Sequence, residues 1–167
     1  MNSCVGIVTT NSTILNWLKM KIRIVEFQSK YYDFVLNRIA KTWNVSESRS
    51  NRYISSFLTS ENFSKCYIAL ADGRPVGTGM FAIENDVGCD FLTPWVMGLW
   101  VEPSYRGNGI GQRLTKARFK HARDLGYNHI YLDTQNASDY HKKFGWIDTG
   151  IVARYQGMET QVMIHGL

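Results

Sequence analysis

The sequence is poor in cysteine, and its few cysteines form no recognisable pattern. Cys4, Cys66 and Cys89 are odd in number and far apart, and no Cys-x-x-Cys motif occurs. Disulfide-stabilised domains carry an even set of cysteines at short spacings, and many zinc and redox sites use paired cysteines. We therefore predict a chain without a disulfide framework, from a reducing compartment such as the cytoplasm.

Metal-ligand spacing and long apolar runs are missing as well. The four histidines are His121, His129, His141 and His165. Their spacing is not that of metal ligands, so we expect no metal site. No apolar run approaches the roughly 18 residues of a membrane span, and residues 1–20 lack the basic and apolar regions of a secretory signal. The sequence therefore predicts neither membrane association nor secretion.

Positive charge exceeds negative charge, with a formal net charge of +5. The densest basic set is Arg113, Lys116, Lys120 and Arg123. Its spacing places the four cations in one stripe on a helix, which is either a solvated face or a positive surface near a phosphate site. No zinc-finger spacing or aromatic–basic RNA motif accompanies the charge. We expect no nucleic-acid partner, and a nucleic-acid-binding module is the weakest of the alternatives.

Hydrophobic periodicity predicts alternating strands and helices without repeats or linkers. Strands are predicted over 21–27, 66–71, 76–84, 94–101, 129–134, 146–154 and 159–165, and helices over 31–45, 50–58, 110–125 and 138–144. Mixed elements of this kind indicate an α/β or α+β sheet with helices packed on it. Residues 1–19 carry no such pattern, so we expect an N-terminal extension followed by one domain over 20–167.

A glycine-rich turn precedes the helix predicted over 110–125. Gly107, Gly109 and Gly111 occupy alternate positions within five residues. A helix start carries unpaired N–H groups and a partial positive charge, and glycine lets those groups approach a bulky anion. The spacing fits neither the dinucleotide fingerprint nor the P-loop. The turn is therefore either a tight packing turn or a binding site for a diphosphate.

The stretch RGNGIG at 106–111 resembles the R/Q-x-x-G-x-G/A signature of the GNAT superfamily of N-acetyltransferases. The preceding strand, the following helix and the segment Lys143-Phe144-Gly145-Trp146 are similar to the same family. The resemblance is strong from about residue 93 to residue 167. Before residue 93, the chain resembles the family only in the order of its predicted strands and helices. Residues 1–19 show no resemblance.

The resemblance implies a mixed, mostly antiparallel sheet of six to seven strands that splays near its centre, with helices on both faces. Acetyl-CoA would lie in the splay, paired through its pantetheine arm with the backbone of 99–101 and through its diphosphate with the glycine loop. The cofactor-binding residues so implied are Leu99, Trp100, Val101, Arg106, Gly107, Asn108, Gly109, Ile110, Gly111, Gln112 and Asn136. Arg106 would either contact phosphate or brace the loop.

The implied reaction is transfer of the acetyl group to a primary amine of a small molecule or a peptide. Direct attack needs no covalent enzyme intermediate, so neither Cys66 nor Cys89 is assigned as a nucleophile. A catalytically silent acyl-CoA sensor is the alternative. A homodimer paired through sheet edges is also expected.

The proton donor is the point at which this sequence departs from the family. Many members carry a tyrosine four residues before the glycine of the Gly-Phe/Trp pair, but here His141 takes that position and Tyr140 precedes it. Either side chain could protonate the leaving sulfur, because a proton donor favours thiolate departure. We expect the acceptor pocket within 27–60 and 84–95. The candidate general bases are Glu84, Asp86, Asp90 and Glu102, with a water chain as the alternative.

Overall fold

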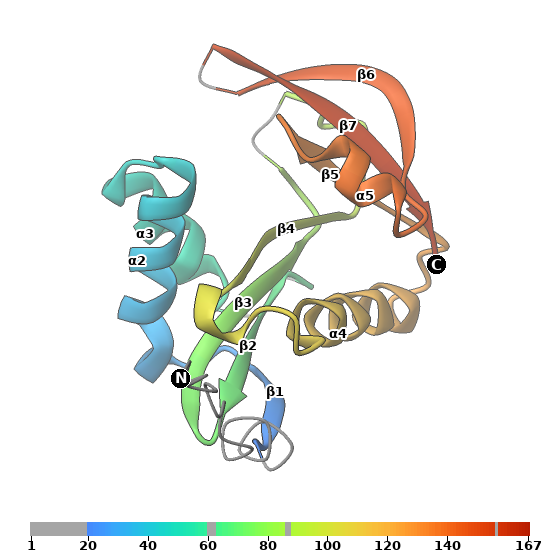
Figure 1. The fold of residues 1–167 in the computed structure, drawn as a ribbon. Coiled ribbons are helices and arrows are strands. Elements are labelled where there is room, and N and C mark those ends of the chain that lie inside the picture. Colours follow the sequence, from blue (N-terminus) through green and yellow to red (C-terminus); the bar gives the residue numbers. More distant parts are fainter. Residues whose placement is uncertain (1–19, 60–62, 86–87, 156) are drawn as a thin grey trace, which may run out of the picture.

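The computed structural model describes residues 20–59, 63–85, 88–155 and 157–167, so the predicted extension over 1–19 lies outside the described residues. The elements in chain order are β1 (Ile22–Glu26), η1 (Ser29–Tyr31), α2 (Tyr32–Trp43), α3 (Glu47–Ser56), β2 (Lys65–Ala71), β3 (Arg74–Ala82), β4 (Trp95–Val101), η2 (Pro103–Tyr105), α4 (Ile110–Asp124), β5 (His129–Thr134), α5 (Ser138–Lys142), β6 (Ile147–Tyr155) and β7 (Met158–Gly166). Figure 1 shows their arrangement.

The predicted elements agree with the structure except at some boundaries. The second helix was expected over 50–58, but α3 begins at Glu47. The preceding helix ends at Trp43, its C-cap residue Asn44 adopts the left-handed conformation, and Ser46 occupies the N-cap position of α3. The chain therefore turns in two residues and enters the next helix earlier than its apolar residues alone indicate.

The strands form one seven-stranded sheet in the order β1-β2-β3-β4-β5-β7-β6. All neighbouring strands are antiparallel except β4 and β5, which are parallel. A parallel pair requires a long crossover connection, and α4 provides it. The predicted mixed, mostly antiparallel sheet is confirmed.

The centre of the sheet opens between β4 and β5. Within the described residues this ladder consists of one Cα pair, Trp95 with Tyr131, next to a 2.9 Å hydrogen bond from the Tyr131 amide to the Pro94 carbonyl. Beyond this point the two strands diverge, as Figure 1 shows. We call this opening the V. Its presence confirms the expected splay.

A β-bulge lies on the β4 side of the V. Met97 is opposite Met80, whereas Trp100 is opposite Thr78, so β4 carries an extra residue there. Gly98 has a φ of 58°, and a Cβ at this position would lie 3.0 Å from the sulfur of Met80. Glycine is therefore required at the bulge, which bends β4 away from β5.

Helices cover both faces of the sheet (Figure 1). Alternate residues of a strand point to opposite faces. In β2, Cys66, Ile68 and Leu70 pack with residues of α2 and α3, whereas Tyr67 and Ala69 pack with residues of α4. We call these the α2–α3 face and the α4 face. No helix in the described ranges is long and apolar enough to cross a bilayer.

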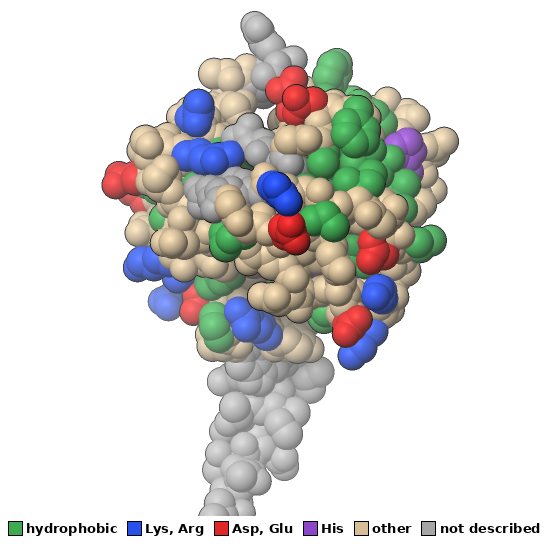
Figure 2. All heavy atoms as spheres, turned by 90° about the horizontal axis from the view of Figure 1, so that it is seen from above, with side chains coloured by type: hydrophobic (Ala, Val, Ile, Leu, Met, Phe, Trp, Pro, Cys, Tyr) green, Lys and Arg blue, Asp and Glu red, His purple; other side chains and the backbone are tan. Residues whose placement is uncertain are grey.

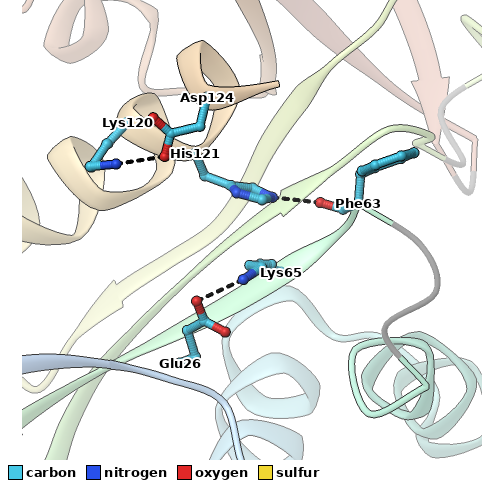
Figure 3. A network of polar contacts seen from close by, with 6 residues as sticks. All are labelled: Glu26, Phe63, Lys65, Lys120, His121 and Asp124. Carbon is cyan, nitrogen blue, oxygen red and sulfur yellow. Dashed lines mark hydrogen bonds and ion pairs between the residues drawn. The ribbon is translucent and has the colours of Figure 1, made fainter. Parts of the chain in front are cut away.

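Helix α4 runs along its face with a buried row at every fourth position. The row consists of Ile110, Leu114, Arg118 and Ala122. Near the end of the helix, the Nε2 atom of His121 lies 2.6 Å from the carbonyl oxygen of Phe63, just before β2 (Figure 3). This contact ties the C-terminal half of α4 to the first half of the sheet, and its N-terminus lies beside the end of β4.

Candidate functional site

The loop between β4 and α4 exposes the start of a helix. Gly107 and Gly109 have φ values of 80° and 70°, a conformation that L side chains rarely adopt, and Gly109 is the N-cap residue of α4. A Cβ at either position would have no neighbour within 4 Å. The first backbone N–H groups of α4 lack intrahelical acceptors, so they are available to an anion.

Gly111 is not required by the fold. It lies inside α4 without a positive φ, and a Cβ there would approach nothing closer than a methyl carbon of Val101, at 4.0 Å. Glycine within a helix is less stable than alanine by about 0.5–1 kcal/mol. The missing side chain thus costs stability and leaves space beside the first turn of the helix, which fits the close approach of a phosphate group.

Two side chains fasten this loop to itself. The Nε atom of Arg106 donates to the Val101 carbonyl at 3.0 Å. The amide of Asn108 donates to the carbonyls of Tyr105 and Arg106, at 3.1 Å each. Of the two roles expected for Arg106, this geometry favours bracing of the loop, because the side chain turns back to the end of β4.

The end of β4 is also held by α2. The Arg38 guanidinium forms an ion pair with Glu102 at 3.2 Å, and its Cζ lies 4.5 Å from the centroid of the Trp100 ring. Glu102 is therefore engaged with a cation at the rim of the loop. Of the other candidate bases, Glu84 and Asp90 are exposed, and Asp86 lies outside the described residues.

The two candidate proton donors lie in different environments on α5. Tyr140 is 54% exposed, and its ring packs on Phe144 with a centroid distance of 4.9 Å. His141 is half-buried between Tyr140 and Trp146. Burial and, secondarily, the positive charge of Arg118 lower the pKa of His141 below its ordinary value. His141 is the inner residue of the pair and is mainly neutral at neutral pH.

Sequence reasoning missed a half-buried carboxylate, Asp133. This residue lies in β5, and the Asn85 amide donates to its Oδ1 at 3.2 Å. Leu132 packs on the α4 face, so Asp133 belongs to the opposite face together with Tyr131, which packs near Met97. Burial raises the pKa of Asp133 above its ordinary value. The sequence signal that could have identified Asp133 is a carboxyl residue inside a predicted strand.

A second missed residue is Arg118, the cation in the buried row of α4. Its side chain is 2% exposed. The guanidinium donates to the Thr115 hydroxyl at 2.9 Å, and to the carbonyls of Leu114 and Met97 at 3.4 Å each. Burial lowers its pKa to about 10, so it remains positively charged at neutral pH. Its place between Leu114 and Ala122 at i+4 spacing was visible in the sequence.

The remaining candidates are Cys66 and Asn136, and neither has the properties of a catalytic group. The Sγ atom of Cys66 lies 3.5 Å from the Thr78 hydroxyl oxygen, and burial raises the thiol pKa to about 12, which makes it unreactive at neutral pH. Asn136 is exposed in the bend between β5 and α5. No group of three or more potential ligands in the described part of the chain could hold a metal ion.

Comparison with known proteins identifies similar sequences. The sequence model described as the acetyltransferase (GNAT) family matches residues 24–146. Human N-acetyltransferase 8B is 26% identical over an alignment of 132 residues that covers 70% of this chain. The matched region spans 58% of that human protein, so this chain corresponds to a little over half of it.

Solved structures show the same fold. An acetyltransferase of the GNAT family from Staphylococcus aureus superposes with a TM-score of 0.67 at 16% identity, covering 88% of this chain and 99% of that one. An aminoglycoside 6'-N-acetyltransferase complexed with coenzyme A superposes with a TM-score of 0.69 at 18% identity, covering 86% and 96%. The resemblance inferred from the glycine loop is thus confirmed.

Proposed function

Because this chain belongs to the acetyltransferase (GNAT) family, we propose that it transfers the acetyl group of acetyl-CoA to a primary amine. The observation that carries the proposal is the V, which opens between β4 and β5 beside an exposed helix start. Beyond Trp95, β4 has no strand partner on its β5 side within the described residues, so its backbone edge can pair with an extended ligand. The glycine loop at the end of the same strand offers N–H groups to a diphosphate.

The residues present fit this ligand. The backbone of 99–101 would bind the pantetheine arm, and the N–H groups of the loop from Gly107 to Gln112 would bind the diphosphate. The space above Gly111 supports this placement, because the fold gains nothing from its missing side chain. When bound, acetyl-CoA supplies a thioester, which is the activated acyl group of the reaction.

We assign the acceptor amine to the α2–α3 face of the V. An amine with a pKa near 10.4 is protonated at neutral pH and must lose a proton before it attacks. Asp133 lies two residues beyond the last β4–β5 pair, on this face, and its raised pKa suits a proton acceptor. The names of the human relative and of the aminoglycoside enzyme, both N-acetyltransferases, support an amine acceptor.

We assign the leaving sulfur to the side of α5. His141 is the inner of the two candidates, and it would orient or protonate the departing thiolate, while Tyr140 lies outside. The sensor alternative predicts acetyl-CoA binding without turnover. The partner proposed besides the amine is a second copy of the chain, paired through the outer strand β6.

The test combines calorimetry with turnover. We expect acetyl-CoA to bind one site per chain, and CoA to be released with at least one amine among amino acids, polyamines, aminoglycosides and peptide N-termini. Binding without CoA release from any amine would support the sensor and contradict the enzyme. Absence of acetyl-CoA binding would overturn both.

A further inference from the structure

Arg118 lies at the level where the two arms of the V separate. In the preceding half of α4, Leu114 packs in a cluster that includes Leu99 of β4. In the following half, Ala122 packs in a cluster that includes Ile130 of β5. The Arg118 guanidinium lies between these clusters and reaches the carbonyl of Met97 at the β4 bulge. It therefore sits beneath the apex of the V.

The sheet makes room for this cation. A Cβ at Gly79 in β3 would lie 3.3 Å from the Nε atom of Arg118 and 3.5 Å from its Cζ. Contact this tight would displace the guanidinium. The absence of a side chain at Gly79 therefore creates the space in which the buried charge rests.

No acidic side chain among the described residues neutralises the charge of Arg118. None of the ion pairs formed among the described residues includes it, and its acceptors are two carbonyls and one hydroxyl. Burying a cation without an anionic partner is unfavourable, and an apolar residue between Leu114 and Ala122 would avoid the cost. The buried cation at position 118 therefore favours a ligand that carries or develops a negative charge next to it.

The titratable neighbours of Arg118 do not supply that negative charge. Within the described ranges, the titratable groups that interact electrostatically with it are Cys66 in β2 and His141 in α5. Burial keeps the Cys66 thiol protonated at neutral pH, and His141 is neutral or positive at any pH. The acyl transfer proposed for the V, by contrast, releases a negative sulfur.

We propose that Arg118 provides the fixed positive charge that stabilises the CoA thiolate as it leaves the acetyl group. The inference rests on the proposed function. In the step, the amine nitrogen forms a bond to the thioester carbon, the carbon–sulfur bond breaks, and its electron pair goes to sulfur. The protonated amine loses one proton before it attacks and a second as the amide forms, and Asp133 accepts them in turn and passes the first to solvent. Arg118 keeps all its protons and acts through its charge alone.

This role explains how the protein could function with His141 at the position where many family members carry a tyrosine. A mainly neutral histidine transfers a proton to sulfur less readily than a protonated one. A guanidinium near it stabilises the sulfur while the carbon–sulfur bond breaks, so a proton from His141 is needed only after bond breaking has begun. A cation near a developing anion stabilises it strongly in a buried site.

The first test uses three variants of α4. We expect Arg118→Met to lower kcat by roughly 10- to 100-fold, since buried electrostatic groups contribute effects of this order. Arg118→Lys keeps the charge and should recover part of the loss. Arg123→Met removes an exposed cation from the same helix and should not change kcat. The dissociation constant of acetyl-CoA, whose thioester is neutral, should stay within about threefold in all of them.

The second test needs no turnover. CoA carries a thiol with a pKa near 8.5, whereas desulfo-CoA lacks the sulfur. We expect the wild-type protein to prefer CoA over desulfo-CoA increasingly between pH 6.5 and 8.5, by about tenfold at the upper end. Arg118→Met should abolish this pH-dependent preference. By NMR, the same variant should raise the pKa of His141, because a nearby positive charge is removed.

Three outcomes would overturn the inference. The first is an unchanged kcat in a folded Arg118→Met variant. The second is an unchanged preference for CoA over desulfo-CoA in that variant. The third is that the wild type transfers an acyl group bearing a carboxylate faster than it transfers acetyl, and that Arg118→Met loses this preference. Arg118 would then bind the carboxylate of the acyl group rather than stabilise the thiolate. If the wild type binds no acetyl-CoA, the proposed function and the inference fail together.

Discussion

At the scale of single residues, His141 and Tyr140 are adjacent but have different surroundings. His141 is half-buried beside Trp146, and Tyr140 is exposed. We expect His141→Ala to lower kcat by about tenfold or more, and Tyr140→Phe to leave it within about twofold. CoA release under saturating substrates measures both. A loss confined to Tyr140→Phe would reverse the assignment, and equal losses would leave neither residue distinguished as the donor.

Asp133 is the residue with the clearest expected pH signature. The pKa of Asp133 is raised above its ordinary value. As the pH falls through this raised pKa, the carboxylate becomes protonated and cannot accept a proton, so kcat/KM should fall. Asp133→Asn should lower kcat/KM by roughly 100-fold at neutral pH and remove this acid limb. Asp90→Asn, an exposed acid predicted from the sequence, is the matched control. A loss in the control alone would favour the sequence-based candidate.

The same pKa shift has a consequence for stability. A carboxyl whose pKa is higher in the folded chain than in the unfolded chain binds its proton more tightly when folded, so its contribution decreases as the pH rises through that range. Asp133→Asn should therefore keep or increase the melting temperature at neutral pH. A normal melting temperature with low activity separates a catalytic role from a structural one.

At the scale of elements, the start of α4 is the feature with the sharpest test. Gly111→Val should raise the dissociation constant of acetyl-CoA by about tenfold or more, which corresponds to about 1.4 kcal/mol. Gly111→Ala should weaken binding less and should stabilise the free protein by about 0.5–1 kcal/mol, because alanine is the better helix former. Calorimetry and thermal unfolding measure the two effects. Unchanged binding by a folded Gly111→Val variant would contradict the placement of the diphosphate.

The sequence predicted this element well because its signals are local. Helix starts, glycine turns and strand alternation depend on neighbouring residues, so the loop at 106–111 and most boundaries were correct. The start of α3 was missed because Ser46 and Glu47 give no apolar signal of their own.

The buried Arg118 and the half-buried Asp133 were missed for a different reason. Asp133 and Arg118 occupy positions in a strand and a helix where a polar residue normally marks the solvated side. Their burial depends on segments far away in the chain, because Asn85 covers one and Gly79 accommodates the other. A single sequence does not reveal such contacts. The position of Arg118 in a row of otherwise apolar residues at i+4 spacing could nevertheless be recognised from the sequence.

At the scale of the whole molecule, the outer strand β6 marks the expected dimer surface. Figure 2, viewed from above the molecule of Figure 1, shows hydrophobic side chains gathered in one area and charged side chains scattered elsewhere. The exposed large hydrophobic residues of α5, β6 and the turn between them are Tyr140, Phe144, Ile147 and Val152. An unpaired edge with apolar side chains favours pairing with another strand.

The dimer prediction is tested by mass measurement in solution. We expect the wild-type chain to run as a dimer in light scattering, and Ile147→Lys with Val152→Lys to shift it to a monomer with the melting curve of a folded protein. Lys substitutions block edge pairing through charge. A monomeric wild-type chain at micromolar concentration would contradict the prediction.

The single pair between Trp95 and Tyr131 leaves the sheet as two half-sheets, and α4 packs on both of them. Within the described residues, the helix acts as a crossbar whose two ends lie against different halves. Any change in the angle between the two half-sheets must tilt α4 and reorient the backbone amides at its N-terminus. We therefore expect a ligand bound at the narrow end of the opening to change the orientation of the helix-start amides that we propose for diphosphate binding.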